Sequence, residues 1–299
     1  MRFSELPSDL GLTVIRDAPF ANLGFLFDDL PDKLVFVAAP RFLTAAGKAK
    51  GVCSILTTPE LASRFHDYSG LAIADDAQLA FFRIQEFLVE KTEFYLRPLP
   101  SEIHRSARVH PAAVIAAGNV SIGAESVIEA NVVIERGVTI GSAVRIRAGS
   151  IIGAEGFQTA HFGQEIRQMS HGGGVIIQDG ADVFANAVIA RGVFRQSTLI
   201  GEGSRVGNGA FVSHNVQVGK RCFIGHNATI NGNTVLGDEV WIGPNATISN
   251  MLEIGDRAWV ALGSTVIESL SAGVHVTGMT ALPHRRLLRR LVSIRSGHA

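Results

Sequence analysis

Residues 200–230, IGEGSRVGNGAFVSHNVQVGKRCFIGHNATI, decide how most of this chain folds. Here and further on, an aliphatic residue returns at every sixth position without interruption. The series is Ile200, Val206, Val212, Val218, Ile224, Ile230, Leu236, Ile242, Ile248, Ile254, Val260 and Val266. Neither the 3.6-residue period of a helix nor the two-residue period of a simple strand produces this spacing. A six-residue repeat is typical of a parallel β-helix, which we therefore predict.

The same spacing occurs earlier in the chain, in three shorter runs. They are Ile103, Val109 and Ile115; Ile122, Ile128, Ile134, Ile140, Ile146 and Ile152; and Ile177, Val183 and Ile189. Three hexads make one triangular coil, so residues 18 apart stack on one face, and stability comes from stacking successive coils. A glycine follows the aliphatic residue in many hexads, where we expect a tight turn. These are Gly123, Gly141, Gly201, Gly207, Gly225, Gly243 and Gly255.

The repeat is interrupted at residues 157–174, FQTAHFGQEIRQMSHGGG, and more briefly around 190–199. An insertion into a solenoid that is rich in Gly, His and Phe is usually a loop at a binding face. We therefore predict that the loop 157–174 covers a ligand site.

Composition changes sharply near residue 100. Residues 1–100 contain 5 of the 32 Gly and 11 of the 17 Phe. We predict an α/β domain over 1–100, a β-helix over 101–272 and a basic C-terminal helix over 273–299. In the first domain we expect strands at 34–39 and 52–58 and helices at 40–50 and 76–91, and at the end of the chain a short amphipathic helix at 283–299.

The balance of 27 basic and 27 acidic residues excludes a globally basic nucleic-acid binder. We expect no membrane span, because no apolar run approaches the roughly 20 residues that one needs. We see no signal-peptide pattern at the N-terminus. The two cysteines, Cys53 and Cys222, form no disulfide framework, and Cys222 occupies a core position of its hexad. We therefore expect a reduced, cytoplasmic protein.

Four stretches carry a resemblance to a known family. They are FVAAPRFL (36–43), GAEGFQTA (153–160), RQMSHGGGVII (167–177) and ARGVFRQSTLIGEGSRVGNGAFVSHNVQVG (190–219). Together with the order of the predicted domains, they resemble the UDP-3-O-(3-hydroxyacyl)glucosamine N-acyltransferases of lipid A biosynthesis. The resemblance implies a left-handed β-helix, a homotrimer and a uridine-binding N-terminal domain. It also implies transfer of a 3-hydroxyacyl group from acyl carrier protein to the 2-amine of a UDP-3-O-acyl-glucosamine-type sugar, without cofactor or metal.

The chain departs from the family pattern at several positions. Ala39 stands where the family has Asn, Ala190 and Gly207 stand where it has acidic residues, and Met251 stands where it has a second histidine. The C-terminal helical region is also shorter. These departures bear on the substrate more than on the chemistry.

The candidate catalytic pair is His214 and Gly232. A neutral imidazole is suited to take the proton of an amine nucleophile, and a backbone N–H is suited to stabilise the oxyanion of the tetrahedral intermediate. Gly232 lies 18 residues after His214, which is one coil, or about 4.8 Å, along the same edge. The resemblance points to the same two positions. His226 lies 12 residues on, at another edge, and reads as structural.

Further candidates contact the substrate in this reading. They are Phe42, Phe157, His171, Arg191, Asn208 and Asn215. All of them except Arg191 have a plainer alternative: Phe42 in the core, Phe157 as a loop anchor, and His171 (with His161) as a solvated loop residue. Asn208 and Asn215 are alternatively turn residues that tolerate left-handed backbone. The basic C-terminal helix either meets acyl carrier protein or caps the prism.

Three other readings keep the fold. One is an N-acetyltransferase that uses acetyl-CoA or another acyl-CoA on a nucleotide amino sugar. Another is an inactive trimeric scaffold, because His214 lacks its acidic neighbours. A third, a zinc enzyme, needs three histidines, and His214 and His226 have no third nearby.

Overall fold

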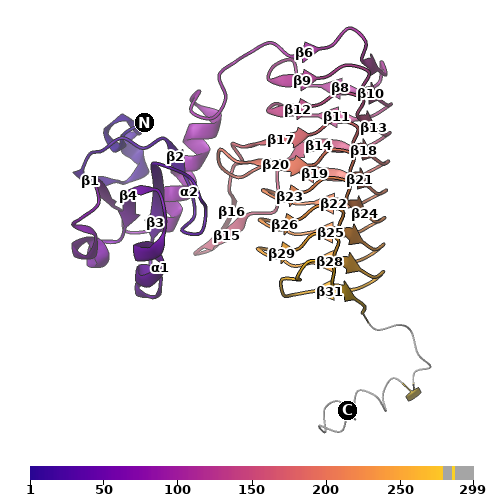
Figure 1. Cartoon of the computed structure of the whole chain (residues 1–299). Coiled ribbons are helices and arrows are strands. Elements are labelled where there is room, and N and C mark those ends of the chain that lie inside the picture. The colour runs from indigo at the N-terminus through magenta and orange to yellow at the C-terminus, as the bar shows by residue number, and fades with distance from the viewer. Residues whose placement is uncertain (279–284, 287–299) are drawn as a thin grey trace.

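The computed structural model describes residues 1–278 and 285–286 of the 299-residue chain. Figure 1 shows a small α/β unit lying beside a tall prism of short strands. Within the described part, no helix is long and apolar enough to cross a membrane.

The N-terminal unit is built on a five-stranded sheet in the order β1-β5-β4-β3-β2. Its strands are β1 (Thr13–Arg16), β2 (Asn22–Leu23), β3 (Lys33–Val37), β4 (Val52–Thr57) and β5 (Gly70–Ile73). The pairs are parallel except for β1 with β5. β3 and β4 confirm the two predicted strands, whose apolar runs are buried because helices and loops cover the sheet.

Two α-helices confirm the helical predictions for this unit. A 3-10 turn, Pro40–Phe42, leads into α1 (Leu43–Lys48), and α2 spans Ala77–Glu90. Asp76 caps α2 because its carboxylate accepts a hydrogen bond from the Leu79 N–H at 2.9 Å. Three further 3-10 segments are Phe3–Glu5, Ser8–Leu10 and Pro59–Phe65. The buried side of α2 packs against both this sheet and residues of the prism loops.

The prism consists of three parallel sheets, and successive strands of the chain pass from one sheet to the next. One sheet contains β7 (Arg108–Val109), β10 (Val127–Ile128), β13 (Arg145–Ile146), β18 (Asp182–Val183), β21 (Arg205–Val206), β24 (Phe223–Ile224), β27 (Trp241–Ile242), β30 (Trp259–Val260) and β32 (His275–Val276). A second contains β8 (Val114–Ile115), β11 (Val133–Ile134), β14 (Ile151–Ala154), β19 (Val188–Ala190), β22 (Phe211–Val212), β25 (Thr229–Ile230), β28 (Thr247–Ile248) and β31 (Thr265–Val266). The third contains β6 (Glu102–Ile103), β9 (Val120–Ile122), β12 (Val138–Ile140), β17 (Gly174–Ile177), β20 (Ser197–Ile200), β23 (Gln217–Val218), β26 (Val235–Leu236) and β29 (Glu253–Ile254).

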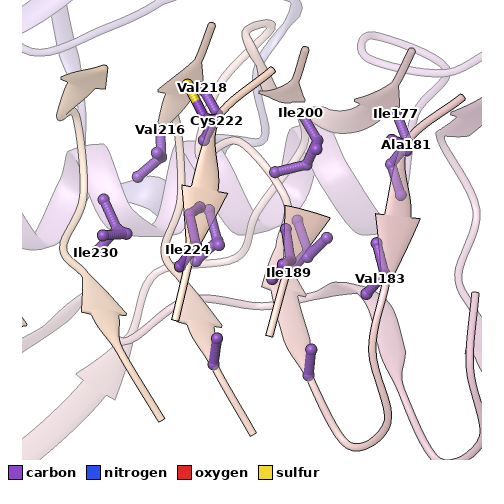
Figure 2. Close-up of a cluster of buried hydrophobic side chains, with 14 of the residues drawn as sticks. Ile177, Ala181, Val183, Ile189, Ile200, Val216, Val218, Cys222, Ile224 and Ile230 are labelled. Carbon is purple, nitrogen blue, oxygen red and sulfur yellow. The ribbon is translucent and has the colours of Figure 1, made fainter. Parts of the chain in front are cut away.

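The register confirms the predicted coil. Val212 pairs with Ile230 and Ile230 pairs with Ile248, each 18 residues on. From Ile122 onward the sixth-position residues point into the prism, where they form one continuous core (Figure 2). In the first run Val109 and Ile115 are partly buried against this core, and Ile103 is 46% exposed. Cys222 is fully buried in that core, as its hexad position predicted.

The glycines after the inward residues serve a different purpose from the one expected. Gly207 lacks a left-handed φ, but a Cβ there would lie 2.7 Å from the carbonyl carbon of Gly225. These glycines therefore allow successive coils to approach closely. The left-handed residue stands two positions later in the hexad, as at Gly203, Gly209 and Asn215. Each hexad does contain a tight turn, as expected, but the left-handed residue of that turn is not the glycine that follows the inward residue.

The insertion at 157–174 contains an element that the sequence did not predict, an antiparallel hairpin of β15 (Thr159–Phe162) and β16 (Glu165–Gln168). The hairpin extends toward the N-terminal unit (Figure 1), where the ring of Phe162 contacts that of Phe82 at a centroid distance of 5.1 Å. The second break places Phe194 in the core of the N-terminal unit. Both interruptions therefore fasten the two units together.

The prism extends to β32, inside the segment 273–299 that was assigned to a C-terminal helix. The predicted helix at 283–299 lies outside the described residues, apart from Arg285 and Arg286. The predicted domain boundaries at residues 100 and 272 remain predictions.

Candidate functional site

His214 lies at a corner of the prism, just after β22, and its side chain is buried with 7% of the residue exposed. The coil above stacks directly on it, because the Asn233 N–H donates a hydrogen bond to the His214 carbonyl at 3.0 Å. A Cβ on Gly232 would lie 2.8 Å from Cε1 of the His214 ring and closer still to Nε2. The predicted stacking of His214 and Gly232 is therefore present, and only glycine leaves room for the imidazole.

The inserted loop covers the other side of the same ring. A Cβ on Gly156 would lie 2.6 Å from His214 Nδ1. The imidazole thus stands between two glycines, one from the next coil and one from the loop. The Gly232 N–H donates no hydrogen bond within the described part of the chain, so it is available to a ligand.

His171 reaches the same place from the return of the loop. Its ring packs edge-on against that of His214, with the centroids 5.7 Å apart. Nδ1 lies 2.8 Å from the Met169 carbonyl oxygen, and the backbone N–H donates to Glu155 Oε1 at 3.0 Å. Nε2 is buried and has no hydrogen-bond partner among the residues that the structure describes. The loop therefore brings a second imidazole to the candidate base.

Both imidazoles are neutral at pH 7. Burial, with the nearby His171 adding to the effect, lowers the pKa of His214 to about 4. Burial likewise lowers the pKa of His171 to about 4, with Arg191 adding to the effect and the bond to Met169 opposing it. A neutral imidazole carries the lone pair that a general base needs. Among the described residues no carboxylate is bonded to His214, and its polar neighbour is the Ser213 hydroxyl at 3.3 Å from Nδ1.

Arg191 is buried and its guanidinium is already engaged. It donates to the carbonyl oxygens of Gly153 at 2.6 Å and Arg136 at 2.8 Å. Arg191 and His171 also line a small cavity of about 20 Å³, together with Tyr95. In this arrangement Arg191 holds the start of the loop and places positive charge beside His171.

Asn215 is buried and adopts the left-handed backbone, with φ at 58°. Its side chain donates to Asn233 Oδ1 at 2.9 Å and to Gln196 Oε1 at 3.2 Å, and accepts from the Val193 N–H at 3.0 Å. The turn role suggested for Asn215 is thus present. The same residue also lines a groove of about 600 Å³ between the prism and the N-terminal unit, and Met251 lines it further along.

Three of the predicted contact residues are not brought to this corner. Phe42 lies on the N-terminal unit with 37% of its surface exposed and the Arg41 guanidinium 4.9 Å from its ring centroid. Phe157 is 84% exposed, although it directly follows Gly156. Asn208 stands one hexad before His214, at another corner, where its N–H donates to His226 Nδ1 at 3.1 Å. That bond gives His226 the structural role expected for it.

The sequence did not single out Gly156, Ser213 or Gln196. Gly156 stands inside the quoted stretch 153–160, and Ser213 directly precedes His214, so their neighbours were the available signal. Gln196 stands inside the quoted stretch 190–219, but nothing in the sequence relates it to its partner Asp28, which lies in the other unit, 3.3 Å from Gln196 Nε2. No group of three or more His, Cys, Asp or Glu side chains that could hold a metal ion occurs among the described residues.

Comparisons with known proteins bear on the fold of the chain and on the proteins to which it is similar. The family model described as "Bacterial transferase hexapeptide (six repeats)" matches residues 197–232. The model "Hexapeptide repeat of succinyl-transferase" matches residues 113–136, 119–154 and 215–250. The first match includes both His214 and Gly232, and the two models confirm the predicted parallel β-helix of hexapeptide repeats.

The relatives with similar sequences share one description. The UDP-3-O-acylglucosamine N-acyltransferase of Pseudomonas syringae pv. syringae (strain B728a) is 27% identical over 257 residues, which cover 73% of this chain and 69% of that protein. The protein of the same name from Pseudomonas aeruginosa (strain LESB58) is 42% identical over 82 residues, which cover 27% of this chain and 23% of that protein. Among solved structures, a UDP-N-acetylglucosamine acyltransferase from Campylobacter jejuni is 19% identical, with a TM-score of 0.49 over 65% of this chain and 83% of that chain.

Proposed function

We propose that this chain is an N-acyltransferase of lipid A biosynthesis, like the UDP-3-O-acylglucosamine N-acyltransferases to which it is similar. In this proposal it moves a 3-hydroxyacyl group from acyl carrier protein to the 2-amine of a UDP-3-O-acyl-glucosamine-type sugar. The observation that carries the proposal is the neutral, buried imidazole of His214, set against the Gly232 backbone in the region that matches the family models.

The proposed chemistry uses two groups. As the sugar amine attacks the thioester carbon, its nitrogen becomes positively charged and loses a proton to His214. The carbonyl oxygen becomes an oxyanion, for which the Gly232 N–H is the donor. Collapse of the intermediate breaks the carbon–sulfur bond, and the proton held by His214 neutralises the departing thiolate. The amide product and the free thiol then balance the reaction.

The proposal needs no cofactor, because the acyl donor is already activated as a thioester. Phe42, Phe157 and Asn208 lie away from His214 within one protomer, so their contribution to substrate binding depends on a second copy or on a long substrate. We propose a homotrimer for this reason, with the acyl carrier protein docking at the prism. Cys53 and Cys222 are both free thiols, which suits the reducing cytoplasm in which we place the reaction.

A direct assay tests the proposal. The purified protein is offered UDP-3-O-acyl-glucosamine with a 3-hydroxyacyl thioester of acyl carrier protein, and amide formation is followed by mass spectrometry. We expect turnover in the wild type and a loss of about 10²–10⁴-fold in His214→Ala. His226→Ala is the matched control, because His226 is an exposed histidine two hexads further on, at another corner of the prism, and it should retain activity.

The outcomes separate the competing readings. Transfer only from acetyl-CoA, and to a sugar without a 3-O-acyl group, would favour the nucleotide-sugar N-acetyltransferase. Binding of the UDP-sugar without turnover would favour an inactive scaffold. An unchanged rate in His214→Ala would remove His214 from the mechanism.

A further inference from the structure

The protonation of His171 follows from its contacts. Its Nδ1 lies 2.8 Å from the Met169 carbonyl oxygen, and a carbonyl only accepts, so Nδ1 carries a hydrogen. Because the ring is neutral, Nε2 carries a lone pair and no hydrogen. That lone pair is buried, and the described part of the chain offers it no donor in this structure. Since only 1% of His171 is exposed, an unfilled acceptor here costs free energy and indicates a partner that arrives or moves.

The unfilled acceptor faces the candidate base. The point that a Gly156 Cβ would occupy is 3.1 Å from His171 Nε2 and 2.6 Å from His214 Nδ1. Both nitrogens therefore converge on the same bare glycine. The other nitrogen of His214, Nε2, faces Gly232. His171 thus lies on the Nδ1 side of the His214 imidazole, and Gly232 lies on its Nε2 side.

An imidazole base needs its hydrogen on one defined nitrogen, so that the lone pair of the other nitrogen faces the substrate. If Nδ1 carries the hydrogen, Nε2 offers its lone pair toward Gly232, where the reaction is proposed to occur. In many enzymes a carboxylate selects this tautomer by accepting the Nδ1 hydrogen. No carboxylate contacts His214 among the residues described, and the acceptors within reach are His171 Nε2 and the Ser213 hydroxyl.

We propose that His171 is the positioning residue of this site, and that its Nε2 accepts the Nδ1 hydrogen of His214. A small rotation of either ring, or one bridging water, closes the contact. His171 thereby holds His214 in the form whose Nε2 lone pair faces Gly232. Its effect on catalysis rests on the proposed function, whereas its effect on the hydrogen position of His214 does not.

The surroundings keep the pair neutral. Arg191 places positive charge near His171, and Arg136 lines the same small cavity. Glu155 accepts from the backbone N–H of His171 and so lies on the main-chain side of the residue. Tyr95 closes the cavity with its ring against Gly172. A neutral acceptor orients His214 without raising its affinity for protons, whereas a carboxylate in the same place would raise that affinity.

The first test needs no substrate. In nitrogen-15 NMR of the histidine side chains of the whole protein at pH 7, we expect His214 with its hydrogen on Nδ1. In His171→Phe, which keeps a ring but has no acceptor, we expect His214 to populate the other tautomer. His171→Gln retains an acceptor and should restore the wild-type spectrum of His214. A wild-type His214 with its hydrogen on Nε2 would overturn the proposal, whether or not the variants fold.

The second test uses turnover. We expect His171→Phe to lower kcat by about tenfold or more with a small change in KM, and His171→Gln to recover most of the loss. His161→Gln is the matched control, because His161 lies exposed on the hairpin of the same loop. Ser213→Ala should leave the tautomer unchanged. If Ser213→Ala changes it and His171→Phe does not, then Ser213 is the acceptor and the proposal is wrong.

Discussion

At the scale of single residues, the site is defined by the burial of two histidines without a counter-charge. Burial disfavours the charged form of an imidazole, and here it lowers the pKa of His171 and His214 from 6.5 to about 4. The same burial that keeps the candidate base unprotonated makes the folded state sensitive to acid. The catalytic and thermodynamic consequences therefore share one cause.

The lowered pKa values predict how stability depends on pH. The unfolded chain binds a proton at each of these histidines near pH 6.5, whereas the folded protein does so only near pH 4. Their contribution to stability is therefore complete above pH 6.5 and is lost as the pH falls toward 4. We expect the free energy of unfolding, measured in urea at pH 7 and pH 4.5, to fall less for His171→Gln than for the wild type. In His161→Gln the free energy of unfolding should fall as much as in the wild type. Equal losses in all three proteins would contradict the prediction.

The residue-level site was only partly accessible from the sequence. The stacking of His214 on Gly232 followed from the 18-residue coil, because the spacing alone fixes which residues are neighbours. The approach of His171 to His214 could not follow, since it depends on how the hairpin folds back. Gln196 and Asp28 meet across two units, and no periodicity relates them.

At the scale of the elements, the prism depends on a left-handed residue at each corner. One corner contains Gly209, Asn227, Asn245 and Gly263 in successive coils, with φ of 65°, 54°, 56° and 65°. Glycine adopts this backbone without strain and asparagine adopts it at modest cost, whereas most residues do not. The sequence predicted the repeat and its core, but assigned the turn to the wrong glycine, because close approach and left-handed backbone both select glycine.

Asn245 tests this account of the corners. It is exposed, and its side chain forms no hydrogen bond with the described part of the chain, so a substitution there changes little except backbone preference. We expect the free energy of unfolding of Asn245→Gly to lie within about 0.5 kcal/mol of the wild-type value. It should be about 1 kcal/mol lower in Asn245→Ala and lower still in Asn245→Val. Urea unfolding followed by circular dichroism measures these differences. Equal stability of the Gly, Ala and Val variants would refute the role assigned to the corner.

At the scale of the whole molecule, the α/β unit and the prism share the loops that carry the site. Phe194, from the second break in the repeat, lies fully buried with its ring 5.0 Å from that of Phe25 and 6.0 Å from that of Phe81. Gln85 of α2 donates to the carbonyl oxygens of Ser170 at 2.9 Å and Val193 at 3.0 Å. Ser170 directly precedes His171, so the N-terminal unit fixes the loop that brings this imidazole to His214.

Phe194→Ala tests that coupling. Removing a fully buried ring should cost about 3–5 kcal/mol, and the cost should fall on the junction between the units rather than on the prism. We expect hydrogen exchange to become faster in α2 and in residues 169–173 together, with β27 and β28 unchanged, because each coil depends only on its neighbours. Phe223→Ala is the control, since 49% of Phe223 is exposed on the prism surface, and it should leave exchange in α2 unaltered. If α2 loosens while residues 169–173 keep their protection, the loop is held by the prism alone, and the N-terminal unit has no part in placing His171.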